Sequence, residues 1–312
     1  MSSHARPRVA FLGPEGTFTE DALAAAAGGA EIERLPAPTV YDAIIAVDEG
    51  EAELAMVPFE NSIEGSVRAT LDTLAFDARS VVIVGEHDQP ISHSLIARTE
   101  IKLDAIEVVL SHPQATAQCA HFIRRVLPRA GVRAASSTAD AVREVAESIQ
   151  PWAALGAAAA AALYGCVVLR EGVEDEPDNV TRFVWLAREG SRPTGTGSFR
   201  TTLVFSELGA DHPGALVDAL VELSERGVNM TRIESRPRRR GLGRYMFFVD
   251  LDGAVDDPAV AAGLDGLRRK AENVRVLGSY PVGGSGLPIE VGGPAPGAGG
   301  VRAGAPPADD DG

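Results

Sequence analysis

The chain has 312 residues, of which 45% are hydrophobic and 23% are charged, and its formal net charge at pH 7 is −15. This composition predicts a globular protein with one large domain and one smaller domain. The strong acidity disfavours nucleic acid and membrane surfaces as partners, because both carry negative charge. We therefore expect small-molecule partners, no nucleic acid and no membrane.

The N-terminal stretch MSSHARPRVAFLG has no apolar signal core after its charges. The longest apolar run, residues 153–169, is dominated by alanine and interrupted by glycine, so we interpret it as a packed helix followed by a strand. Cys119 and Cys166 lack CxxC spacing, which favours two buried, reduced thiols. These features predict a cytoplasmic protein.

From residue 8 to about residue 188, short β-branched runs alternate with helical periodicity. Such alternation predicts α/β layers with mostly parallel sheets, which bind ligands at the carboxyl ends of their strands. The predicted strands are 8–13, 52–58, 80–86, 91–98, 106–112, 166–173 and 181–188, and the predicted helices are 21–27, 115–127, 138–149 and the alanine-rich stretch from 153.

Residues 189–199 are rich in Gly, Ser, Thr and Pro, which predicts a linker between domain 1–188 and a second domain, 200–282. The second domain has a predicted βαββαβ order, typical of the ferredoxin-like fold. Its expected elements are 201–208, 213–227, 229–237, 243–253, 258–273 and 274–281. Residues 283–312 have little apolar content, which predicts a disordered tail.

Two polar loops follow the first predicted strands. In GPEGTFTED, Thr17 and Glu20 have capping-box spacing, and a helix N-terminus beside Thr17 would offer donors to a ligand carboxylate. In VPFENSIEGSV, Pro58 is expected to end the strand, so that Glu60, Asn61 and Ser62 emerge at its tip. The capping and the ligand-binding interpretations of the first loop are compatible.

Two further polar loops lie later in the first domain. In SHPQ, Ser111 and Gln114 again have capping-box spacing, which favours Gln114 as a cap partner when propensity alone is considered. In DNVTRF, Thr181 and Arg182 stand at the start of a predicted strand. Amides, hydroxyls, one arginine and a few carboxylates are suited to orienting a polar anion and passing one proton.

Other chemistries find less support. No serine or cysteine has a nucleophile context such as GxSxG. The six histidines lack HExxH or CxxC companions, so structural or surface roles are favoured over metal binding. We therefore expect no metal and no cofactor.

The motifs GPEGTFT, PFENSIEGSV, SHPQA and DNVTRF, in this order and spacing, resemble the signature motifs of the prephenate dehydratase family. The stretches GALVDAL, from Gly214, and NMTRIESRP, from Asn229, resemble the regulatory ACT domain of the same family. The resemblance covers roughly residues 8–282.

The resemblance implies an α/β fold: a two-lobed catalytic domain like the periplasmic binding proteins, with a cleft between its lobes, followed by a ferredoxin-like βαββαβ ACT domain. It implies a carbon-oxygen lyase that removes water and carbon dioxide from prephenate to give phenylpyruvate, in L-phenylalanine biosynthesis. The driving force lies in the substrate, whose ring becomes aromatic. The enzyme has to hold two carboxylates and assist the departing hydroxyl.

Matching the family's motifs to this chain assigns the roles of its residues. Thr181 is the implied donor to the leaving hydroxyl, and Glu60, Asn61 and Gln114 match the other catalytic positions. The implied substrate-binding residues are Thr17, Ser62, Arg182 and Phe183. Because an acid near a dicarboxylate repels it, we expect Glu60 to orient Asn61 or Arg182 before it contacts substrate, and we expect Glu64 to be a surface residue.

The ACT resemblance implies that phenylalanine binds at a subunit interface and inhibits the enzyme. The expected effector-binding residues are Gly214, Ala215, Leu216, Asn229, Glu234 and Ser235. The chain is expected to form a homo-oligomer, at least a dimer and preferably a dimer of dimers, through side-by-side pairing of apolar strands such as TTLVFSEL and RYMFFVDL. The arginines at 236, 238, 239, 240 and 244 favour a solvated turn over a nucleic-acid site.

Two alternatives stay open. The substrate could be arogenate, which carries an amino group where prephenate has a keto oxygen, but no carboxylate is obviously dedicated to that ammonium. The chain could instead be a non-catalytic sensor that only binds an amino acid in a two-lobed cleft. The joint presence of Thr181, Asn61 and Gln114 favours an enzyme.

Overall fold

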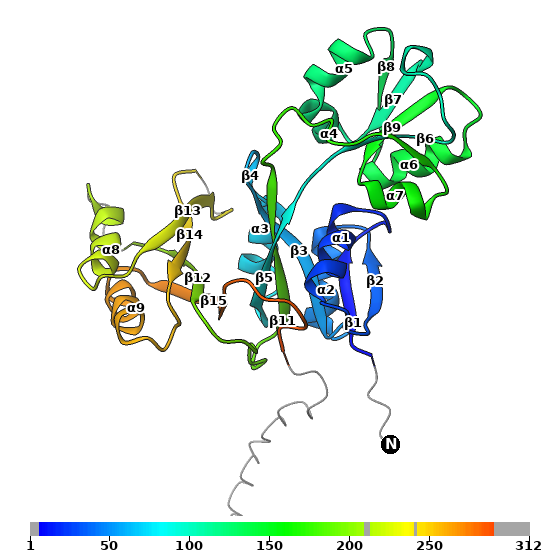
Figure 1. The fold of residues 1–312 in the computed structure, drawn as a ribbon. Coiled ribbons are helices and arrows are strands. Elements are labelled where there is room, and N and C mark those ends of the chain that lie inside the picture. Colours follow the sequence, from blue (N-terminus) through cyan, green and yellow to red (C-terminus); the bar gives the residue numbers. More distant parts are fainter. Residues whose placement is uncertain (1–5, 209–212, 240–241, 290–312) are drawn as a thin grey trace, which may run out of the picture.

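The computed structural model describes residues 6–208, 213–239 and 242–289. The fold has three parts, which are the two lobes of an N-terminal α/β domain and a C-terminal domain. The first lobe lies between the other two parts (Figure 1). Within the described residues, no helix has both the length and the apolar character needed to cross a membrane.

The first lobe is built on a sheet with strand order β2-β1-β3-β11-β5, to which the short β4 adds by pairing with β3. β1 pairs in parallel with β2 and β3, whereas β11 is antiparallel to both β3 and β5. The strands are β1 (Arg8–Leu12), β2 (Glu33–Ala37), β3 (Leu54–Asn61), β4 (Gly65–Ser66), β5 (Val81–Pro90) and β11 (Val180–Arg188), and the helices are α1 (Phe18–Ala26), α2 (Val40–Glu49) and α3 (Arg68–Phe76).

The second lobe has a sheet with strand order β10-β6-β9-β7-β8. Its strands are β6 (Ser94–Ala97), β7 (Val108–Ser111), β8 (Gly131–Ala134), β9 (Trp152–Gly156) and β10 (Val167–Arg170). Its helices are α4 (Pro113–Gln118), α5 (Ala120–Val126), α6 (Thr138–Glu147) and α7 (Ala158–Leu163), with the 3₁₀ turn η1 (Leu103–Ala105) before β7. Two chain segments join the lobes, one from β5 to β6 and one from β10 to β11.

The two-lobed α/β architecture is confirmed, but the prediction of mostly parallel sheets is wrong. Strand pairs of both directions occur in each lobe. Because the chain crosses between the lobes twice, β11 returns to the first sheet from the second lobe and runs against its neighbours. The alanine-rich run also differs from the prediction: its first residues form β9, and the helix begins only at Ala158.

The C-terminal domain has the predicted βαββαβ order. It consists of β12 (Phe199–Ser206), α8 (Ala215–Ser224), β13 (Met230–Pro237), β14 (Tyr245–Asp252), α9 (Pro258–Lys270) and β15 (Asn273–Pro281). The sheet has strand order β13-β14-β12-β15, so β13 and β15 are its edges. The strands TTLVFSEL and RYMFFVDL, expected to pair with another subunit, are instead the central β12 and β14.

The two faces of this sheet have different partners. One face packs against α8 and α9, with Leu203, Phe205, Val249 and Leu251 among its buried residues. The other face contributes Met246, Phe248, Leu277 and Tyr280 to the core of the first lobe. The C-terminal domain therefore completes the core of the first lobe and is not merely tethered to it.

The predicted tail is ordered at its start. Leu287 and Ile289 pack against the first lobe, and Ile289 forms a β-bridge with Pro193 of the linker. The Gly286 N–H donates to the Ala26 carbonyl over 2.8 Å. The prediction of a disordered tail from residue 283 is thus wrong for 283–289, and residues 290–312 lie outside the described part of the chain.

Candidate active site between the lobes

A cavity of about 460 Å³ lies between the two lobes. Its walls come from the first lobe through the loop after β1 and the ends of β3 and β11, and from the second lobe through α4 and the start of α6. The two joining segments contribute Ile91, His93 and Asn179 to the wall. The segments are hydrogen-bonded to each other, because the Ile91 N–H donates to the Asn179 carbonyl over 2.8 Å. Five residues predicted for the site line this cavity, namely Thr17, Asn61, Gln114, Thr181 and Phe183.

Asn61 and Thr181 form the polar centre of the cavity. They are paired residues of β3 and β11, and each side chain is largely buried. The Asn61 Nδ2 donates to Thr181 Oγ1 over 2.9 Å, while the Asn61 Oδ1 accepts from the backbone N–H groups of Ile63 and Glu64 at 3.0 and 2.9 Å. Since the amide is held at both ends, the Thr181 oxygen acts as an acceptor and its hydrogen is available to a ligand.

A second chain of hydrogen bonds extends this centre along the cavity wall. The Asn61 Nδ2 also donates to Asn179 Oδ1 over 2.7 Å, and Asn179 Nδ2 donates to Gln118 Oε1 over 3.3 Å. The same Gln118 oxygen lies 3.1 Å from His93 Nε2. Because a carboxamide oxygen can only accept, the His93 proton is on Nε2, and Nδ1 is an acceptor.

His93 is buried and neutral in this arrangement. Burial lowers the pKa of its imidazole, against smaller opposing effects of Gln118 and Glu174. Its ring packs edge-on against Phe18 at a centroid distance of 5.1 Å. The buried His93 Nδ1 has no hydrogen-bond partner among the described residues, so the cavity wall includes one unused acceptor.

Two helices begin at the wall of the cavity. The N-cap of α1 is Thr17, as predicted, and the N-cap of α6 is Ser137. Both caps line the cavity, and none of the lining residues in the described part of the chain is a lysine or an arginine. Carboxylate groups of a ligand would therefore be held by N–H and O–H donors and by helix dipoles.

Among the described residues that line the cavity, Asp140 is the one acidic residue. Its carboxylate accepts from the hydroxyls of Ser136 and Ser137 and pairs with Arg143 over 2.6 Å. The Ser136 hydrogen bond, followed by those of Ser137 and Arg143, holds the pKa of Asp140 below its ordinary value despite partial burial. Its charge is already balanced by these neighbours.

Three residues predicted for the site lie outside the cavity. The prediction that the strand ends at Pro58 is wrong, because β3 continues to Asn61. Neighbouring residues of this continued strand point to opposite faces of the sheet. Glu60 and Arg182 therefore point away from Asn61 and Thr181, and they pair with each other at 3.0 Å. The Ser62 hydroxyl accepts from the Val180 N–H over 3.0 Å.

The SHPQ motif is capped differently from the prediction. The N-cap of α4 is His112, whose Nδ1 accepts from the Gln114 N–H, while the buried Ser111 hydroxyl donates to the Leu155 carbonyl. Gln114 is thus released from the expected capping role and lines the cavity.

Sequence reasoning missed His93, Gln118 and Asn179. Two of them carried a signal: Asn179 belongs to DNVTRF, and Gln118 follows Gln114 by one helical turn. His93 had no motif, and only the crossing of the two joining segments brings it to the cavity. Within the described residues, no group of three or more His, Cys, Asp or Glu side chains could hold a metal ion.

The expected effector residues fall into two groups. Gly214 is the N-cap of α8 with φ of 97°, and Ala215 and Leu216 begin that helix. Glu234 and Ser235 are neighbours on β13 and so face opposite sides of the sheet. Asn229 precedes β13, and its Nδ2 donates to Asp252 Oδ2 over 2.7 Å.

The basic hairpin is not simply a solvated turn. Arg236 and Arg239 pair with Asp72 of α3 at 2.8 and 3.3 Å, and Arg238 pairs with Glu207. The hairpin therefore docks on the first lobe in part, and Arg240 lies outside the described residues.

Comparisons with known proteins match both domains of the chain. A family model described as prephenate dehydratase matches residues 9–191, and one described as the ACT domain matches residues 202–267. The prephenate dehydratase of Mycobacterium tuberculosis (strain ATCC 25618 / H37Rv) is 43% identical over 284 residues, which cover 88% of this chain and 87% of the relative.

Solved structures are similar over the same length. The crystal structure of prephenate dehydratase from Arthrobacter aurescens in complex with L-Phe has a TM-score of 0.81 and 42% identity, covering 91% of this chain and 93% of the other. The structure of GqqA, described as a novel type of quorum quenching acylase, has a TM-score of 0.78 and 34% identity, covering 88% and 98%.

Proposed function

The chain belongs to the prephenate dehydratase family of lyases, and we propose that it converts prephenate to phenylpyruvate in the cavity between its lobes. In this reaction the bond from the ring to the leaving carboxylate breaks and releases carbon dioxide. The freed electron pair moves through the ring and expels the hydroxyl on the opposite carbon, which takes up a proton and leaves as water. The ring becomes aromatic, so the substrate itself supplies the driving force.

The observation that carries the proposal is the hydrogen bond from Asn61 to Thr181. Since the Thr181 oxygen accepts from Asn61 over 2.9 Å, its hydrogen can point to the departing hydroxyl, where negative charge develops. A threonine hydroxyl is a very weak acid, so Thr181 acts chiefly as a positioned donor or relay. The proton that completes the water comes ultimately from solvent.

The lining of the cavity suits a substrate with two carboxylates. Hydroxyl donors and the N-termini of α1 and α6 would bind these groups, with Thr17 and Gln114 as proposed contacts. The apolar side chains of Phe18 and Phe183 leave the departing carboxylate poorly solvated, which favours its loss. Asp140 favours prephenate over arogenate, because its charge is already balanced and is not free for an ammonium group.

GqqA is described as an acylase. The cavity offers that activity little support, because the lining serines Ser136 and Ser137 donate their hydroxyls to Asp140 and not to a histidine base. Dehydration is therefore the activity that we propose.

The deciding experiment is incubation of the purified full-length protein with prephenate while phenylpyruvate and carbon dioxide are measured together. We expect both products in equal amounts, and preincubation with a chelator should not change the rate. A protein that binds prephenate or phenylalanine without forming either product would be a ligand sensor, and the proposal would be wrong.

We also propose that phenylalanine inhibits the enzyme through the ACT domain. Support comes from the ACT match and from the L-Phe complex of the Arthrobacter aurescens relative. The proposed site uses the N-terminus of α8 with Asn229 and β13.

The oligomeric state proposed is a homodimer or a dimer of dimers. Side-by-side pairing would use β13, which is an edge strand, and not the central β12 and β14. Val217 and Val221 lie one turn apart on α8 and are exposed, as is Ile233 on β13, so a second copy of the chain could bury them. Analytical ultracentrifugation of the full-length protein tests this oligomeric state.

The cytoplasmic location stays a prediction.

A further inference from the structure

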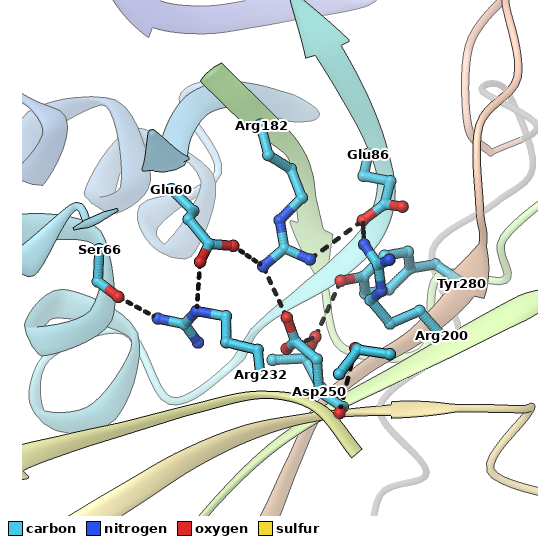
Figure 2. Close-up of polar contacts among 10 residues, drawn as sticks. Glu60, Ser66, Glu86, Arg182, Arg200, Arg232, Asp250 and Tyr280 are labelled. Carbon is cyan, nitrogen blue, oxygen red and sulfur yellow. Dashed lines mark hydrogen bonds and ion pairs between the residues drawn. The ribbon is translucent and has the colours of Figure 1, made fainter. Parts of the chain in front are cut away.

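Two neighbouring residues of β11 serve opposite sides of one sheet. Thr181 lines the cavity, whereas Arg182 points to the ACT domain (Figure 2). Their partners on β3 are also neighbours, since Thr181 pairs with Asn61 and Arg182 pairs with Glu60. Glu60 is bonded to Asn61 and Arg182 to Thr181 through the backbone. A backbone displacement at Glu60 and Arg182 therefore also displaces Asn61 and Thr181.

Arg182 is held by a buried carboxylate of the ACT domain. Its Nη2 lies 2.6 Å from Asp250 Oδ2 and 3.0 Å from Glu60 Oε2, and its Nη1 lies 3.5 Å from Glu86 Oε2. Asp250 is completely buried, and Arg182 is 8% exposed. Burial disfavours the charged guanidinium, but Asp250 and the other neighbours outweigh it, and the pKa of Arg182 lies above its ordinary value.

The position of Asp250 is determined inside the ACT domain. Its Oδ1 accepts from the Thr202 hydroxyl over 2.8 Å, and that hydroxyl lies 2.8 Å from the Tyr280 hydroxyl. All three residues are completely buried. The ACT core therefore fixes the carboxylate that binds Arg182, as Figure 2 shows.

The proposed effector strand contacts the other member of the pair. Arg232 of β13 lies opposite Asp250 in the sheet, with its Nε 3.4 Å from Glu60 Oε1, and it donates to the Ser66 hydroxyl. The guanidinium groups of Arg182 and Arg232 both lie over the Phe59 ring, at 4.9 and 5.0 Å from its centroid. The ACT domain thus contacts both Glu60 and Arg182, from two adjacent strands.

The β3–β11 pairing is irregular at this point. Its register shifts between Arg182 and Phe183, opposite Pro58, which has no N–H for the ladder. Within the described residues, the buried Nε atoms of Arg182 and Arg232 have no hydrogen-bond partner. The strand pairing next to Glu60 and Arg182 is therefore less regular than a continuous ladder.

We propose that Arg182 is a positioning residue through which the ACT domain sets the catalytic geometry. Anchored on Asp250, it holds the segment of β3 and β11 where Asn61 orients the Thr181 hydroxyl. An effector that displaces β13 together with its paired strand β14 would move Arg232 and Asp250 against Glu60 and Arg182, and so misplace that hydroxyl. The inference rests on the proposed dehydratase function and names the route of its regulation.

The test is Asp250→Asn in the full-length protein, which removes the charge that binds Arg182 and nearly keeps the side-chain volume. We expect kcat to fall by up to about 100-fold with little change in KM, because a small misplacement of a catalytic group can cost that much. In a Thr181→Ala background the same substitution should cost no further kcat, because its effect passes through the Thr181 hydroxyl. Inhibition by phenylalanine should weaken as well.

Asp72→Asn is the matched control. It removes other ion pairs between the same two bodies, those of Asp72 with Arg236 and Arg239, and these pairs involve no residue of β3 or β11. We expect it to keep the wild-type kcat. Circular dichroism and thermal unfolding check folding, and if Asp250→Asn does not fold, Arg182→Lys replaces it, because lysine keeps the charge but cannot bind three carboxylates at once.

The outcomes are distinct. Independent, multiplying losses from Asp250→Asn and Thr181→Ala would overturn the inference, as would an equal loss of kcat in Asp72→Asn, which would indicate a general effect of domain docking. A wild-type protein that does not convert prephenate would instead contradict the proposed function. Non-additive losses with an unaffected control support the positioning role.

Discussion

Asn61 donates a hydrogen bond to the oxygen of Thr181 across the β3–β11 pair, at 2.9 Å, while its own oxygen accepts from two backbone N–H groups. In the proposed reaction, the direction of this bond makes Thr181 a donor to the substrate. A threonine whose oxygen already accepts is left with its hydrogen to donate, and a donor is what a departing hydroxyl requires.

Thr181→Ala should lower kcat by about 10²–10³-fold and leave KM nearly unchanged, because the donor acts where charge develops in the transition state. Steady-state kinetics with prephenate measure this. Thr181→Ser keeps the hydroxyl and should retain most of the activity. A Thr181→Ala enzyme with normal kcat and a raised KM would make Thr181 a binding residue.

Asn61→Asp should lower kcat to a similar extent, about 10²–10³-fold, because a carboxylate cannot donate to Thr181 and would turn its hydrogen away from the substrate. The aspartate can still accept from Ile63 and Glu64, so the loop should stay folded. Single-turnover kinetics separate this loss from an effect on product release.

Asn179→Asp is the control for that experiment, since it also adds a negative charge to the cavity. It keeps the oxygen that accepts from Asn61 and loses only the donor to Gln118. We expect a clearly smaller loss of kcat. Equal losses in the two variants would mean that the added charge, and not the missing donor, impairs Asn61→Asp.

The burial of His93 predicts a pH dependence of stability. Because burial lowers its pKa in the folded protein from the ordinary value of 6.5, the unfolded chain binds the proton more readily. The free energy of unfolding should therefore decrease as the pH falls below 6.5 toward the folded pKa, at up to about 1.4 kcal/mol per pH unit.

Denaturant unfolding at several pH values, compared with His93→Gln, measures this contribution, because the other titrating groups are common to both proteins. The difference between the two stabilities should change across that window and be constant above it. An NMR titration that gives His93 a pKa at or above 6.5 would contradict the prediction.

Gly214→Val should abolish inhibition by phenylalanine and leave turnover intact. Gly214 has φ of 97°, which a β-branched residue rarely adopts, and the substitution would distort the start of α8 at the proposed effector site. Inhibition curves and calorimetric titration with phenylalanine measure the effect.

Gly29→Val is the corresponding control, because Gly29 has φ of 85° and similar open space but lies in the first lobe. It should retain inhibition by phenylalanine, although it carries comparable backbone strain. A Gly214→Val protein that is still fully inhibited would place the regulatory site elsewhere.

Much of this protein could be predicted from local patterns. The alternation of strands and helices, the βαββαβ order and the four polar loops depend on residues close together in the chain. The strands β11 and β12 end and begin at Arg188 and Phe199, on either side of the predicted linker. Residue propensity and hydrophobic periodicity can be evaluated over such short stretches, and the motifs were sufficient to indicate the family.

The sides on which residues face depended on the tertiary structure. The sequence could not indicate that β3 continues past Pro58, because a strand can carry a proline where its missing N–H is tolerated at a bulge. That continuation separates Glu60 from Asn61 and Arg182 from Thr181, since neighbours on a strand point to opposite faces.

The contacts between the domains also lie beyond sequence reasoning. Arg182 and Asp250 are 68 positions apart, and the apolar strands β12 and β14, expected to pair between subunits, are instead covered within one chain. A hydrophobic or charged pattern indicates that a side chain requires a packing or ion-pair partner, but it does not identify that partner. Burial and ion pairing depend on proximity in space. Only the folded chain, in which the ACT sheet closes the core of the first lobe, decides that Arg182 belongs to the interface and Thr181 to the cavity.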